Sequence, residues 1–130
     1  MFDRYLIGEK GFRNVTEAGK ATGFQIEVRI AYYRGMGLSM VEGFDVSVDG
    51  RRFPRENNLF TVNGRSFSFA QMESEYEERW EMGDFATLTV PAEGGLAAGA
   101  HEVAITEYLR VSYMPVLSIT RDAKTLTLEP

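Results

Sequence analysis

The side chains that could take part in chemistry are few. The sequence contains one histidine, His101, and no cysteine, so a thiol nucleophile, a thiolate metal site and a site of paired histidines within one chain are all excluded. His101 follows a turn and enters a predicted strand, where a polar residue at the end of a sheet is ordinary. We therefore predict no catalytic residue and no metal ligand on this chain.

Acidic side chains gather in a dense run, which consists of Glu73, Glu75, Glu77, Glu78, Glu81 and Asp84. Paired carboxylates can exchange protons with a substrate, but a run this dense is more typical of a solvated surface. Asp45 to Glu56 also approximates the calcium-loop pattern D-x-[DN]-x-[DN]-G-x5-E. Ser47 departs from that pattern, and Asp49-Gly50 suits a type I′ hairpin turn. A hairpin is therefore the favoured interpretation.

Bulk composition limits the class of protein. The chain has 130 residues, a formal net charge of −5 and a sequence pI near 4.9, which predicts one domain spanning residues 1–130 and argues against a nucleic-acid backbone as partner. No apolar run is long enough to cross a bilayer, so no membrane contact is expected. The first residues are partly acidic and lack the apolar core of a signal peptide, and a cytoplasmic location is the expectation.

Strands must position whatever site exists. From Ala98 to Tyr113 apolar and polar residues alternate, which predicts a central strand with one face toward a core. Glu107 interrupts the apolar face, where a charge needs a partner, a bulge or an edge position. Further strands are expected at 11–16, 23–31, 41–48, 51–54, 59–62, 65–69, 85–90 and 118–128, with hairpin turns at 49–50 and 63–64, loops at 32–40 and 92–100, a helical turn at 70–73 and a turn at 122–123.

This pattern predicts an all-β fold, an antiparallel β-sandwich of immunoglobulin-like or jelly-roll-like type with at most short helical turns. On such a scaffold the aromatic, arginine and methionine residues of three segments are the candidates for a partner interface, because these residue types are enriched at interface centres. For Trp80 and Tyr113, filling the sandwich core is the competing interpretation. The candidates are Tyr32, Tyr33, Arg34, Met36, Arg79, Trp80, Tyr113 and Met114.

Several blocks of residues together are similar to one known family. They are Tyr32-Tyr33-Arg34-Gly35, Leu38-Ser39, Val41-Glu42, Glu78-Arg79-Trp80, Ala86–Val90, Gly94-Gly95-Leu96, Gly99, His101-Glu102-Val103, Arg110, Ser112–Pro115 and Lys124–Leu128. In their order and spacing these blocks resemble the small (beta) subunit of bacterial C-glycoside deglycosidases. The resemblance covers almost the whole chain.

The resemblance implies a β-sandwich subunit that pairs with a larger TIM-barrel alpha subunit in a hetero-oligomer. The alpha subunit is expected to carry a divalent metal, manganese, whereas this chain is expected to hold no cofactor. The complex would act as a carbon–carbon lyase that splits a 3-oxo-C-glycoside, separating the 3-oxo sugar from an aromatic aglycone by elimination. No catalytic residue is carried over onto this sequence, so the chain alone is expected to be an inactive accessory subunit.

Two alternatives remain open from the residues themselves. Sugars stack on exposed tyrosine and tryptophan rings, so the chain could instead be a stand-alone carbohydrate-binding β-sandwich module. An independent hydrolase would have to use two carboxylates of the acidic run. Binding of glycosides by the isolated chain distinguishes the first alternative, and turnover by the isolated chain distinguishes the second.

Overall fold

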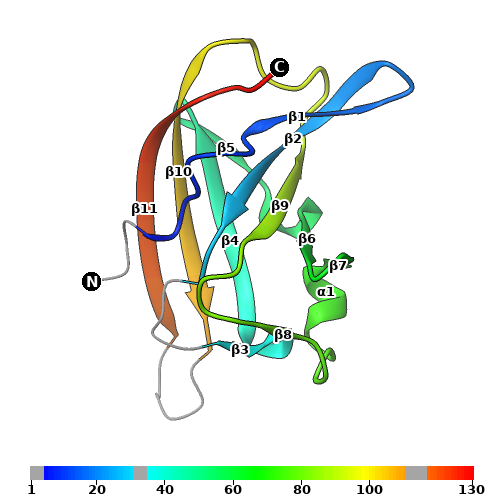
Figure 1. Cartoon of the computed structure of the whole chain (residues 1–130), viewed down its shortest axis with the longest axis vertical. Helices are drawn as coiled ribbons and strands as arrows, with labels where there is room; N and C mark the ends of the chain where they lie inside the picture. The colour runs from blue at the N-terminus through cyan, green and yellow to red at the C-terminus, as the bar shows by residue number, and fades with distance from the viewer. Residues whose placement is uncertain (1–4, 31–34, 111–116) are drawn as a thin grey trace.

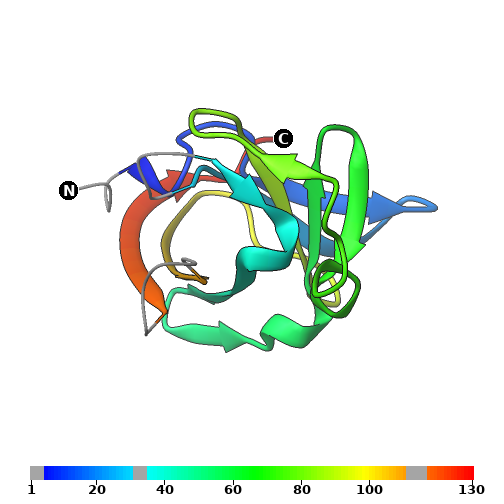
Figure 2. The same ribbon diagram turned by 90° about the horizontal axis from the view of Figure 1, so that it is seen from below.

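Two antiparallel β-sheets pack face to face in the computed structural model, which describes residues 5–30, 35–110 and 117–130 (Figure 1). The larger sheet has the strand order β1-β2-β9-β6-β7, the second has the order β11-β10-β4-β5, and β3 pairs with β8 in a short third sheet. Seen from below, the sheets curve around a common interior (Figure 2). The predicted antiparallel β-sandwich is confirmed.

The strands of the described residues are β1 (Arg13–Glu17), β2 (Lys20–Val28), β3 (Met36–Gly37), β4 (Val41–Val48), β5 (Arg51–Phe53), β6 (Leu59–Val62), β7 (Arg65–Ser68), β8 (Arg79–Trp80), β9 (Ala86–Pro91), β10 (Ala100–Leu109) and β11 (Ser118–Thr127). The helical pieces are the α-helix α1 (Phe69–Met72) and the 3-10 turns η2 (Leu38–Met40) and η3 (Arg55–Asn57). Within the residues described, no helix has the length and apolar character that crossing a membrane requires.

Two tight turns set the register of the hairpins, as predicted. Asp49 and Gly50 have φ values of 51° and 83°, and Asn63 and Gly64 have φ values of 54° and 77°. Positive φ at both central residues defines the type I′ turn, whose twist matches that of the flanking strands. These turns place Val48 opposite Arg51 and Val62 opposite Arg65.

The core lies between the inner faces of the two large sheets. Alternate residues of β10, including Val103, Ile105 and Leu109, are buried, as the period of two predicted. Glu107 is also fully buried on this face, where it lies opposite Phe44 on β4 and Thr120 on β11. The register of β10 against β4 shifts at its far end, between Tyr108 and Leu109.

Hydrogen bonds of Asp122 and Lys124 with the backbone of Ile7, together called the polar clamp, join β11 to the first described residues. The backbone N–H of Ile7 donates to Asp122 Oδ2 at 3.0 Å, and Lys124 Nζ donates to the carbonyl oxygen of Ile7 at 2.5 Å. The predicted turn at Asp122-Ala123 is therefore wrong, because both residues pair within an unbroken β11. Inward-pointing charges of this kind are one way in which proteins protect an edge strand.

Other element boundaries shift by a few residues. The helical turn occupies 69–72 instead of 70–73, and the capping box of Ser68 and Gln71 explains its start. Part of the predicted loop at 32–40 forms β3 and η2, while Pro91 belongs to β9 as its last residue. The ends predicted for the strands at 23–31 and 98–113 fall on residues outside the described part.

Candidate functional site

The short β3–β8 sheet brings together those interface candidates that the structure describes. Met36 lies opposite Trp80, and Gly37 lies opposite Arg79. Trp80 is fully buried and Met36 is 9 % exposed, whereas the Arg79 side chain is 55 % exposed. Of the three, Arg79 is therefore the candidate whose side chain is exposed, although it is paired with Glu81. The candidates Tyr32, Tyr33, Arg34, Tyr113 and Met114 lie outside the described residues.

Trp80 belongs to an aromatic cluster in the core. Its ring centroid lies 5.1 Å from that of Phe60 and 6.1 Å from that of Phe44, both in edge-on geometry. Its indole N–H donates to the carbonyl oxygen of Asp84 at 3.0 Å. A buried tryptophan with a satisfied N–H and edge-on neighbours is a packing residue. Trp80 therefore fills the core of the sandwich, as the competing interpretation held.

Two carboxylates of the acidic run, those of Glu78 and Glu81, form surface ion pairs. Glu78 accepts hydrogen bonds from Asn63 Nδ2 at 2.8 Å and from Arg65 Nη1 at 2.9 Å, and these bonds lower the pKa of the Glu78 carboxyl. Glu81 pairs with Arg79 at 2.9 Å. Over the ranges that the structure covers, no group of three or more His, Cys, Asp or Glu side chains could hold a metal ion.

His101 joins the β4–β5 hairpin to the loop before β10. Its Nδ1 lies 2.6 Å from Asp49 Oδ2, and its Nε2 lies 2.6 Å from the carbonyl oxygen of Ala97. The Ala97 carbonyl and then the Asp49 carboxylate raise the pKa of His101, since both favour the protonated ring. Because both ring nitrogens face acceptors, the imidazolium is the form that satisfies both bonds. His101, predicted to be an ordinary histidine at the end of a sheet, therefore has a structural role in linking the hairpin to this loop.

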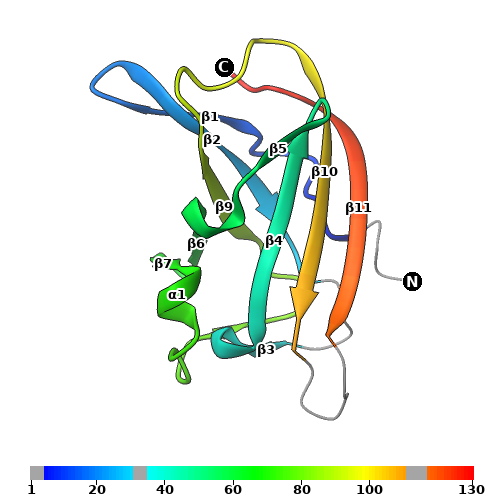
Figure 3. The same cartoon turned by 180° about the vertical axis from the view of Figure 1, so that it is seen from behind.

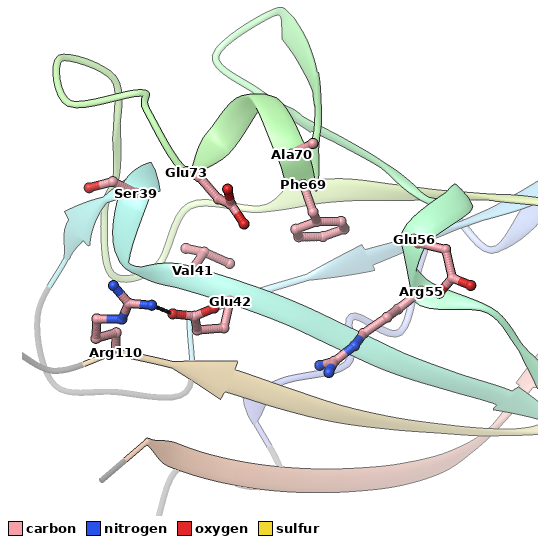
Figure 4. A pocket seen from close by; sticks show the side chains of 9 residues that line it. All are labelled: Ser39, Val41, Glu42, Arg55, Glu56, Phe69, Ala70, Glu73 and Arg110. Carbon is pink, nitrogen blue, oxygen red and sulfur yellow. Dashed lines mark ion pairs between the residues drawn. The ribbon is translucent and has the colours of Figure 1, made fainter. Parts of the chain in front are cut away.

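A cleft of about 590 Å³ opens at the sandwich edge between β4, α1 and η3 (Figure 4). Its volume lies within the range of small-molecule sites, about 300–1,000 Å³. The lining residues come from distant parts of the chain: Ser39, Val41, Glu42, Arg55, Glu56, Phe69, Ala70, Glu73 and Arg110. β5 pairs with only the last part of β4, Val46–Val48, and this leaves room for the cleft beside the first part.

Ion pairs fix the polar walls of this cleft. Glu42 and Arg110 form a close ion pair, and both residues occur in the blocks that carried the family resemblance. Arg55 Nε lies 3.8 Å from Asp45 Oδ1, and the Arg55 guanidinium lies 4.9 Å from the centre of the Tyr108 ring. The Tyr108 hydroxyl donates to Asp45 Oδ2 at 2.6 Å, and this bond is the main cause of the raised pKa of Tyr108.

One aromatic ring and two further carboxylates complete the cleft. Phe69, at the start of α1, packs on Phe44 and Phe60 at centroid distances of 6.0 and 6.1 Å while lining the cleft. Glu56 stands on η3 and Glu73 directly follows α1, and Figure 4 shows them on either side of Phe69. Sequence reasoning missed this grouping, because residues this far apart in the sequence give no local signal.

Comparison with known proteins identifies the family. The family model described as "C-glycoside deglycosidase beta subunit" matches residues 2–113. A C-glycoside deglycosidase beta subunit of Eubacterium cellulosolvens is 33 % identical over 114 residues, covering 87 % of this chain and 78 % of the relative. A 3'-dehydrocarminate deglycosidase beta subunit of a Microbacterium species is 34 % identical over 97 residues, covering 73 % and 71 %.

A solved structure, the CooA pilin subunit of enterotoxigenic Escherichia coli, aligns with 92 % of this chain and 88 % of its own at 10 % identity. Its TM-score of 0.28 is too low to carry an argument. The family match and the curated relatives agree with each other over most of the sequence. The chain belongs to the C-glycoside deglycosidase beta subunit family.

Proposed function

We propose that this chain is the accessory subunit of a carbon–carbon lyase and assembles with a larger TIM-barrel alpha subunit. In that complex the alpha subunit would use a divalent metal, manganese, to cleave the bond between a 3-oxo sugar and an aromatic aglycone by elimination. The observation that supports this proposal is the family match over residues 2–113, since the name beta subunit implies a second subunit. A cytoplasmic location is part of the proposal.

The segment around β8 is the surface we propose for the alpha subunit. Tyr76 is 76 % exposed and Met82 is 42 % exposed, and they flank the exposed Arg79 along the chain. Exposed tyrosine, methionine and arginine are the residue types that interface centres favour. The side chain of Trp80, in contrast, is buried inside the sandwich and is not part of this surface.

Co-expression with the alpha subunit tests the proposal. The expected result is a complex of fixed stoichiometry in size-exclusion chromatography, with lyase activity toward a 3-oxo-C-glycoside in the complex and none in this chain alone. Tyr76→Ala combined with Met82→Ser should weaken the complex. Leu59→Ser is the matched control, since Leu59 is 44 % exposed on β6. Two proteins that elute separately, or turnover by this chain alone, would refute the proposal.

The cleft favours a second candidate function, the binding of a glycoside by this chain itself. A ring edge at Phe69 beside the carboxylates of Glu42 and Glu73 offers both apolar contact and acceptors for sugar hydroxyls. Calorimetric titration of the isolated chain with a C-glycoside would yield saturable heat if the cleft binds sugar. Replacement of Ala70 with arginine, which would project into the cleft, should then abolish the heat. The absence of heat with the unaltered chain would exclude this function.

A further inference from the structure

The outer face of the four-stranded sheet, whose strands β4, β10 and β11 lie toward the viewer in Figure 3, carries a second hollow beside the cleft described above. It has a volume of about 210 Å³, room for about seven waters at about 30 Å³ each. Its floor consists of the small side chains Ser47, Ala104 and Thr106, and Arg52 and Arg121 also line it. A hollow bordered by two guanidinium groups over hydroxyl-bearing residues is suited to an anion.

The sheet register places the two arginines on opposite sides of this floor. Arg52 lies opposite Ser47 and Ser47 lies opposite Ala104, while Arg121 lies opposite Thr106. β5 and β11 are separated by three strand spacings, which amount to about 14 Å at about 4.8 Å per spacing. Side chains as long as arginine can approach the middle from both borders, because the residues between them are short.

Neither arginine is neutralised in the part of the chain that the structure describes. No ion pair or hydrogen bond of the Arg52 or Arg121 guanidinium occurs there, although the chain as a whole has a formal net charge of −5. Asp45 also lines the hollow, but its Oδ2 accepts from Tyr108 and its Oδ1 faces Arg55. Among the described residues, the one carboxylate that lines this hollow is therefore already engaged by Tyr108 and Arg55.

An adjoining hollow of about 440 Å³ shares Ser47, Ala104 and Arg121 with the first and continues along the same face. It contains the carboxyl group of Glu102, which lies opposite Thr125 at the other end of the sheet. Lys124 lines this second hollow as well, whereas both arginines line the first. A ligand with one anionic group could place that group between the arginines and the rest of its body along the second hollow.

We propose that Arg52 and Arg121 form an oxyanion-binding site on the outer face of this sheet, with Ser47 and Thr106 as hydroxyl donors. Its ligand class is a carboxylate or phosphate group, which the planar guanidinium binds through paired N–H donors. The proposal does not depend on the alpha-subunit contact or on glycoside binding in the cleft, although Asp45 lines this hollow and pairs with Arg55 of the cleft. It can therefore be tested on the isolated chain.

The test is a titration of the isotopically labelled chain followed by two-dimensional NMR, first with inorganic phosphate and then with succinate, at constant ionic strength maintained with sodium chloride. The expected result is a saturable shift of the Ser47, Ala104 and Thr106 amide signals with at least one of the two anions. Binding of succinate alone would assign a carboxylate ligand, and binding of phosphate alone would assign a phosphate ligand. Shifts that grow linearly with both anions, or none at all, would overturn the proposal.

Variants separate this site from general attraction of anions. Arg52→Gln and Arg121→Gln should each weaken binding by at least about tenfold, the loss expected for a charged hydrogen bond. Arg51→Gln is the matched control, since Arg51 neighbours Arg52 on β5 but packs over the Phe53 ring at 4.7 Å. The control should bind as the unaltered chain does. Equal weakening by all three variants would also overturn the proposal.

Discussion

Replacing Trp80 by alanine tests whether this residue is a core residue or a surface residue. Trp80 is fully buried, stacks edge-on against Phe60 and donates its indole N–H to Asp84. Truncation of a buried aromatic to alanine costs about 3–5 kcal/mol through lost transfer energy and the cavity left behind. Since domains are stable by about 5–15 kcal/mol, Trp80→Ala should remove a large share of the free energy of unfolding.

Thermal unfolding followed by far-ultraviolet circular dichroism measures this loss. For a chain of this size, about 1 kcal/mol corresponds to a change in Tm of about 3–5 °C, so Trp80→Ala should lower Tm by about 10–25 °C. Trp80→Phe keeps an aromatic ring and loses the hydrogen bond to Asp84, so its effect should be smaller. Because Trp80 is the single tryptophan of the chain, the emission of the unaltered protein reports on the same site and should be resistant to a soluble quencher.

Tyr76 supplies the matched control, because it is a large aromatic residue that is 76 % exposed. Tyr76→Ala should change the free energy of unfolding by less than about 0.5 kcal/mol, as is usual for surface substitutions. If Trp80→Ala were no more destabilising than Tyr76→Ala, the tryptophan would not be packed in the core. Its assignment as an interface residue would then stand, and the reasoning from packing would fail.

Three further predictions concern polar groups. The pKa of His101 is raised, so the stabilisation by its protonated ring should be complete below about pH 6.5, the unfolded pKa, and lost as pH rises through the folded pKa. The difference in Tm between the unaltered chain and His101→Gln should therefore shrink as pH rises, and a constant difference would contradict this prediction. Asn14 Nδ2 donates to the carbonyl oxygen of Leu96 at 2.9 Å, and Asn14 Oδ1 accepts from the Leu96 N–H at 2.8 Å. Asn14→Ala should therefore lower the free energy of unfolding, measured by urea denaturation, by about 1–3 kcal/mol. Asn58 is 1 % exposed, and its side-chain amide lacks a hydrogen-bond partner within the described ranges; Asn58→Leu should therefore raise stability by about 1–3 kcal/mol, and a fall in Tm would contradict this.

Local sequence signals predicted most of the strands. β4 and β6 have the predicted bounds because alternation and a two-residue turn act within a few residues of each other. The predicted break at Asp122 failed for the opposite reason. Asp122-Ala123 indicated a turn, whereas the side chain of Asp122, like that of Lys124, binds the backbone of Ile7, more than a hundred residues away in the sequence.

The candidate sites were less predictable than the fold. The pairing of Met36 with Trp80 could not be derived from the sequence, since two-residue strands have no usable period. The cleft depends on how far β5 extends along β4 and on where α1 and η3 lie beside it. Glu42 and Arg110 form an ion pair across a distance that no sequence spacing encodes. Composition identified the residue types, and only the packing of the sheets determined which of them meet.

The clamp that joins the first described residues to the last strand has a consequence for how the chain is made. Its hydrogen bonds connect residues 115 and 117 positions apart, and a neighbouring bond from the Gly11 amide to Glu129 spans 118 positions. Contacts of such high contact order form slowly, because a long loop must close before they contribute. During synthesis the backbone of residues 6–8 can pair with residues 27–29 early, whereas its hydrogen bonds to Asp122 and Lys124 can form only after those residues have left the ribosome.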